Sequence, residues 1–183
     1  MTNKNTLFYN NKNYTNIIVD TSSLLKREFE NFMETFIPYL RKSGKKITVP
    51  QAVIREINKF CTGNTPTKEV AAKRTLENIS ALHHAGFIKF EGNPRSTERA
   101  DSYIVGRVIK ARSQSEKILV ITQDFQLAQD ILKTNSMNST LAPANNVNRL
   151  NEFGVLENFD LSRDVAIKPK HNNLSHVLKR FGL

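Results

Sequence analysis

The sequence has little cysteine, little histidine and no long hydrophobic run, and each shortage excludes a class of protein. Cys61 is the single cysteine among 183 residues, so an internal disulfide framework is excluded. No uninterrupted apolar run exceeds four residues, which leaves no candidate for a membrane span or for the apolar core of a signal peptide. We therefore expect a cytoplasmic protein without a membrane partner.

Acidic residues are also in short supply relative to basic ones. The chain has 27 Lys and Arg against 17 Asp and Glu, a net charge of +10. This excess favours a polyanionic partner, and nucleic acid before an anionic membrane, because no basic amphipathic anchor stands out. The alternative is that the charge serves no partner, as in many basic proteins.

Two basic segments are candidates for contact with such a partner. In "RKSGKK", Arg41, Lys42, Lys45 and Lys46 are candidate nucleic-acid-binding residues. The competing interpretation is that they end a helix, where cations complement the helix dipole. The second segment is the chain end, whose apolar stripe of Leu174, Val177, Leu178 and Phe181 is more typical of a docking surface.

The organisation of the chain is that of one domain with flanking segments. We expect a polar N-terminal segment over residues 1–15, a folded domain over 16–150 and a basic tail over 151–183. Short β-rich runs at 17–19, 47–49, 87–90, 118–121 and, weakly, 140–142 alternate with helical patterns at 23–42, 51–60, 67–85, 97–112 and 124–133. This alternation predicts an α/β fold, in which a parallel sheet is wrapped by helices.

Two acidic residues follow predicted strands directly. Asp20 comes after the run Ile17 to Val19, and Asp124 comes two residues after "ILVI". In an open parallel sheet, functional residues collect beyond the carboxyl ends of the strands. Each residue also has a structural alternative, because Asp is a favoured N-cap of the helix that it precedes.

Two further acids lie on predicted helices close to the apolar face. Glu56 falls about 60° from Val53, so it borders the buried stripe that Val53, Ile57 and Phe60 are expected to form. Asp101 precedes apolar residues at positions three, four, seven and eight after it, which places its carboxylate on the apolar face. The alternatives are a solvated flank residue for Glu56 and, for Asp101, a first-turn acid after an N-cap at Thr97.

Taken in order, four segments resemble the acidic segments of PIN-domain nucleases: "IIVDTSSLL", "TVPQAVIREINKF", "ERADSYIVGRVIKA" and "ILVITQDFQLAQDI". The resemblance spans roughly residues 16–145. It implies a three-layer α/β/α fold with a central parallel sheet and an acidic pocket that binds Mg²⁺ or Mn²⁺ and cuts single-stranded RNA. It also implies that Asp20, Glu56, Asp101 and Asp124 are the metal-binding and catalytic acids, with Ser22 and Thr122 as supporting hydroxyls.

The residue types agree with that chemistry. Hard divalent cations take oxygen ligands, so the shortage of His and Cys is no obstacle. With no nucleophilic side chain at hand, hydrolysis by metal-activated water is the expected reaction, and RNA the expected substrate. The alternatives are a structure-specific DNA nuclease with the same acids and a catalytically inactive RNA-binding module. A toxin of a toxin–antitoxin pair is a further possibility, as are a homodimer and an inhibitory protein partner.

Overall fold

The computed structural model describes residues 14–63, 65–136 and 144–159. Within them one sheet has the strand order β3-β2-β1-β4-β5-β6. The parallel strands are β1 (Asn16–Val19), β2 (Ile47–Pro50), β3 (Ile88–Glu91), β4 (Ile118–Ile121) and β5 (Asn146–Leu150), and β6 (Leu156–Asn158) is antiparallel to β5. The α/β fold class with a mostly parallel sheet, predicted from the alternating pattern, is confirmed.

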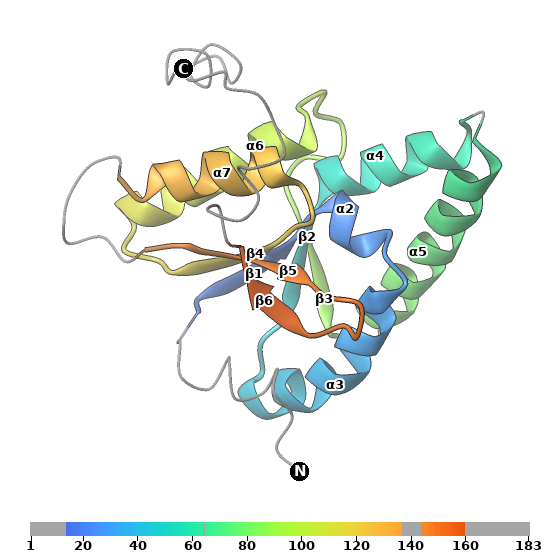
Figure 1. Ribbon diagram of the computed structural model, residues 1–183, viewed down its shortest axis with the longest axis horizontal. Coiled ribbons are helices and arrows are strands. Elements are labelled where there is room, and N and C mark those ends of the chain that lie inside the picture. The colour runs from blue at the N-terminus through green and yellow to red at the C-terminus, as the bar shows by residue number, and fades with distance from the viewer. Residues whose placement is uncertain (1–13, 64, 137–143, 160–183) are drawn as a thin grey trace.

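Helices flank this sheet. They are α2 (Thr21–Leu24), α3 (Glu28–Ser43), α4 (Gln51–Cys61), α5 (Pro66–His84), α6 (Ala100–Ser113) and α7 (Phe125–Thr134). Figure 1 shows α6 and α7 on one side of the sheet and α3 on the other. Helix α4 packs against α5 and also contacts α2 and α6, so it lies where the functional segments meet.

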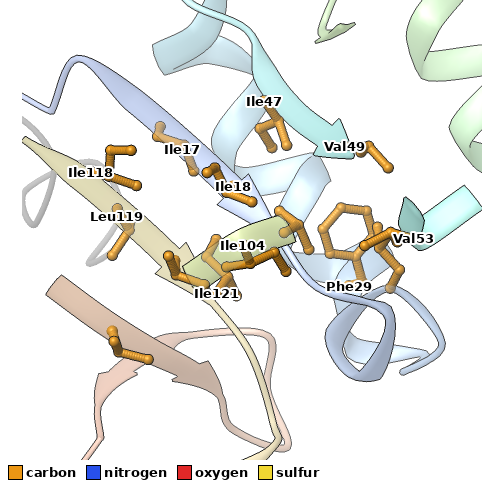
Figure 2. Packing of buried hydrophobic residues seen from close by; sticks show 14 of the residues in the cluster. Ile17, Ile18, Phe29, Ile47, Val49, Val53, Ile104, Ile118, Leu119 and Ile121 are labelled. Carbon is orange, nitrogen blue, oxygen red and sulfur yellow. The ribbon is translucent and has the colours of Figure 1, made fainter. Parts of the chain in front are cut away.

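The core is centred on β1, which lies between β2 and β4. All residues of β1, β2 and β4 are buried, as expected for parallel strands that are covered on both faces. Figure 2 shows Ile17 and Ile18 of β1 between these two strands, with Phe29, Val53 and Ile104 contributed by helices.

The strand order places a reversal at the β1/β4 pair. The chain builds β1, β2 and β3 in one direction and then returns to β4 and β5 on the other side of β1. Beyond the carboxyl ends of such a pair, the two crossovers leave in opposite directions and a crevice remains. Asp20 directly follows β1 and Thr122 directly follows β4, so both residues lie at this crevice.

One predicted helix, over 23–42, is divided in the structure. Helix α2 ends at Leu24, and α3 begins only at Glu28. Two side chains of α5 account for part of the break. Thr75 Oγ1 donates to the Leu24 carbonyl oxygen and Arg74 Nη2 to the Leu25 carbonyl oxygen, both at 3.2 Å. These carbonyls are satisfied by a distant helix, which periodicity along the chain does not report.

Other expectations changed at the edges of the domain. Helix α6 begins at Ala100 after Arg99, so the predicted start at 97 and the N-cap at Thr97 are wrong. Strands β5 and β6 were not predicted, and β6 extends the sheet into the segment assigned to the tail. The weak strand at 140–142, the N-terminal segment up to residue 13 and the stripe from Leu174 to Phe181 lie outside the described residues.

In the part of the chain that the structure describes, no helix combines the length and the apolar composition that a membrane crossing needs.

The β5–β6 hairpin packs closely on α3 through Gly154, which generates a stability prediction. Gly154 has φ of 73°, and a Cβ there would lie 2.7 Å from the Glu28 carbonyl oxygen and 2.8 Å from the Phe32 amide nitrogen. Because both neighbours are backbone atoms, Gly154→Ala combines left-handed strain with a steric clash. We expect it to lower the free energy of unfolding by about 3 kcal/mol or more in urea denaturation.

Gly44 is the matched control. It has φ of 65°, but a Cβ there would meet nothing within 4 Å. Gly44→Ala should therefore lower the free energy of unfolding by about 1 kcal/mol, through left-handed backbone strain alone. Equal losses for the two variants would show that the hairpin does not pack on α3 in this way.

Candidate active site

Asp20 is the buried centre of the candidate site. It is only 3% exposed, and it follows β1 as the N-cap of α2. The oxygen Oδ2 accepts hydrogen bonds from Ser22 Oγ at 2.7 Å and Thr122 Oγ1 at 3.0 Å, and from the Ser22 amide at 3.3 Å. The capping interpretation therefore holds for Asp20, and the same carboxylate also joins the ends of β1 and β4.

The two hydroxyls extend this connection into the turn after β4. Ser22 Oγ accepts from the Gln123 amide and Thr122 Oγ1 from the Asp124 amide, both at 2.9 Å. The hydroxyl oxygens themselves lie 3.2 Å apart. Ser22 and Thr122, both predicted as supporting hydroxyls, thus orient the buried carboxylate and hold the turn that carries Asp124.

Asp124 is the exposed acid at the start of α7. Its Oδ1 accepts from the amides of Gln126 at 2.7 Å and Leu127 at 3.0 Å, as expected of an N-cap. Capping occupies one carboxylate oxygen, and Oδ2 accepts no hydrogen bond from the described residues. The capping role therefore leaves one oxygen of Asp124 for another ligand.

Glu56 of α4 and Asp101 of α6 line the same cavity. Both side chains are half-buried, and both line a cavity of about 420 Å³ between α4 and the segment 96–101. Glu56 Oε2 also accepts from Thr21 Oγ1 at 2.7 Å, which connects it to the residue next to Asp20. No pattern in the sequence singles out Thr21, because its partner depends on how close α4 lies to the end of β1.

Arg55 positions the segment that carries Asp101. Its guanidinium donates to the carbonyl oxygens of Asn93 at 3.0 Å and Glu98 at 2.9 Å. This contact fixes the connection between β3 and α6 against α4, so Asp101 faces the same cavity as Glu56. Sequence reasoning missed Arg55, since an arginine one residue before Glu56 resembles any other helical cation.

The electrostatics of Asp20 differ from those of an ordinary surface acid. Burial raises the pKa of its carboxyl group from 3.8 to about 6, and the hydrogen bonds from Ser22 and Thr122 oppose this rise. Charged Asp20 is therefore costly in the protein without a cation. A nearby divalent ion would favour the charged form.

The donor set agrees with a hard divalent cation, but the side chains do not form a closed cage. Carboxylate and hydroxyl oxygens are the ligands that Mg²⁺ and Mn²⁺ take. Among the described residues, no group of three or more His, Cys, Asp or Glu side chains is arranged to hold a metal ion. Mg²⁺ retains several waters and is commonly held by one or two carboxylates together with substrate phosphate, and these residues fit that open mode.

The basic cluster from the sequence lies elsewhere. Arg41, Lys42, Lys45 and Lys46 precede β2, at the amino end of the strands, whereas Asp20 follows β1 at the carboxyl end. Arg41 packs over the Phe87 ring, and Lys45 Nζ donates to the Tyr14 carbonyl. Two of the four cations thus have partners within the domain, at the sheet edge opposite the acids.

The raised pKa of Asp20 predicts a pH dependence of stability. Because the folded-state value of about 6 lies above the unfolded value of 3.8, the folded state holds the proton more tightly. In EDTA, the free energy of unfolding should fall by up to about 3 kcal/mol as the pH rises from about 4 through about 6. Asp20→Asn should remove this dependence and be the more stable protein at neutral pH.

Urea denaturation at several pH values measures this difference. Glu77→Gln, at an exposed position of α5, is the control and should follow the parent protein at every pH. A constant stability difference between Asp20→Asn and the parent across this pH range would contradict the assignment.

Comparison with known proteins identifies the family. A PIN domain family model matches residues 17–148, which contain all four acids and reach from β1 to β5. A comparison with curated proteins gives no significant match. The family is associated with nuclease activity, and thus with a nucleic-acid substrate. Since the matched segment covers most of the chain, as the resemblance of its acidic segments predicted, the protein belongs to the PIN domain family.

Proposed function

We propose that the protein is a metal-dependent endoribonuclease that hydrolyses phosphodiester bonds of single-stranded RNA. The observation that carries the proposal is the buried Asp20 carboxylate at the β1/β4 reversal, which is oriented by two hydroxyls and connected through Thr21 to Glu56. A purely structural N-cap needs neither this burial nor the resulting rise in the pKa of its carboxyl group.

The four acids have different tasks in this proposal. Asp20, with its Oδ2 fixed by Ser22 and Thr122, is the oriented ligand for Mg²⁺ or Mn²⁺. Glu56 and Asp101 face the adjoining cavity, and Asp124 presents its second oxygen from the start of α7. A bound metal would supply polarisation of a phosphate oxygen and a water of lowered pKa, and the acids would hold and orient that water.

Charge explains how an acidic site accepts a polyanion. The chain carries a net charge of +10, which attracts the RNA backbone over a distance set by ionic strength. Close to the acids, phosphate is repelled until a divalent cation lies between them. A divalent cation is therefore needed to bring the scissile phosphate next to the acids as well as for the reaction.

Loss of single acids tests the assignment. We expect Asp101→Asn and Glu56→Gln each to reduce cleavage of a single-stranded RNA oligonucleotide by at least about a hundredfold, equivalent to about 2.7 kcal/mol of transition-state stabilisation. The assay compares Mg²⁺, Mn²⁺ and EDTA, with Glu77→Gln as the control that keeps the parent rate. Parent-level cleavage by Asp101→Asn would disprove the site.

The substrate class is tested in the same assay. Single-stranded RNA, flapped DNA and duplex RNA of matched sequence are offered at equal concentration, and we expect cleavage of the single-stranded RNA to be fastest. Faster cleavage of flapped DNA would identify a structure-specific DNA nuclease instead. Binding of RNA without cleavage in either metal would identify an inactive RNA-binding module.

A further inference from the structure

Phe60 departs from the role that its position in the sequence predicts. It was expected on the buried stripe of α4 with Val53 and Ile57, which are both fully buried. Phe60 is only partly buried, and it lines the same cavity as Glu56 and Asp101. Charged side chains line this cavity too, and Lys68 Nζ lies 5.7 Å from the centroid of the Phe60 ring. An accessible aromatic ring is a stacking surface, and every nucleic-acid base has a face that can stack on it.

Two cations line this cavity without a carboxylate partner. Lys59 of α4 and Arg99 of the opposite segment line the cavity, and both are exposed. Neither makes a salt bridge to any residue in the described ranges, in contrast to Arg107, which is paired with Glu91 and Glu116. Their charge is therefore available to a phosphate group that enters the cavity.

The spacing along α4 connects the ring with the acids. Phe60 follows Glu56 by four residues, so the two lie on one face of the helix and are separated by a rise of about 6 Å. The cavity of about 420 Å³ is within the usual size of a small-molecule site, about 300–1,000 Å³. A base can reach Phe60 only after it has left its own stack, so this geometry selects single strands over duplexes.

From these observations we propose that the cavity between α4 and residues 96–101 binds one unstacked nucleotide of single-stranded RNA. The base stacks on Phe60, and Lys59 and Arg99 contact the phosphates that flank it. The proposal rests on the proposed function and adds to it a subsite next to the scissile phosphate. It also explains how an enzyme with an acidic centre holds its substrate, since Lys59 and Phe60 lie about one helical turn from Glu56, and Arg99 lies two residues before Asp101.

Binding measured without metal tests the subsite independently of hydrolysis. The probe is a ten-nucleotide oligouridylate RNA with a fluorescent label, and its Kd for the full chain is measured by anisotropy in EDTA. We expect Phe60→Ala and Phe60→Leu each to weaken binding about tenfold, and Phe60→Trp to retain it. Phe60→Leu preserves apolar volume, so it reports loss of stacking if Phe60→Ala proves unstable.

The matched control is Phe153, which is 71% exposed in the β5–β6 hairpin and does not line the cavity. Phe153→Ala should bind the probe as the parent does. The double variant Lys59→Ala with Arg99→Ala should reduce the slope of log K against log salt by about 1.4, since each phosphate contact on a single strand contributes about 0.7.

The outcomes separate this subsite from the proposed activity. Loss of binding in Phe60→Leu with retention in Phe60→Trp supports the subsite, whether or not the parent cleaves RNA in Mg²⁺ or Mn²⁺. Parent-level binding by Phe60→Ala, Phe60→Leu and the double variant overturns it, even if cleavage is metal-dependent. Failure of the parent to bind the RNA probe, or equal binding of a ten-base-pair duplex, also overturns it.

Discussion

The hydrogen bonds that converge on the Asp20 carboxylate are the constraint on which the site depends. Ser22 and Thr122 donate to the same oxygen from the ends of β1 and β4, and their own oxygens accept amides of the following turn. The ends of the two central strands, the start of α2 and the start of α7 are therefore also connected through one polar group. Displacement of Asp20 would leave the two hydroxyls without their shared acceptor.

This arrangement is stable only because its polar atoms are satisfied. A buried carboxylate without donors costs several kcal/mol, and three donors reduce that cost without removing it. The remaining cost appears as the raised pKa of the Asp20 carboxyl group. Natural proteins accept such local destabilisation where a cation or a reaction requires a fixed charge, and the surrounding sheet supplies the stability. In this chain the compensating stability comes from the buried strands β1, β2 and β4.

Helix α4 connects the buried centre to the surface that nucleic acid would approach. Glu56 accepts from Thr21 on the side of Asp20, and Arg55 holds the segment before α6 on the other side. The cavity between α4 and residues 96–101 is lined by the acids Glu56 and Asp101. Lys59, Phe60 and Arg99 line the same cavity. A rigid helix can present these different groups at fixed spacing, whereas a loop would have to be ordered by the substrate.

The sequence by itself determined the fold class and the four parallel strands from β1 to β4, and it singled out the four candidate acids. These are local signals: β-branched runs, helical periodicity and Asp directly after a strand. Only the tertiary structure decided which partners these residues have. The division of helix 23–42 depends on donors from α5, the bond from Thr21 to Glu56 spans 35 residues, and β5 and β6 form through pairing that their sequences do not announce. The physical reason is that hydrogen-bond partners and burial are set by distances in space, which periodicity along a chain does not contain.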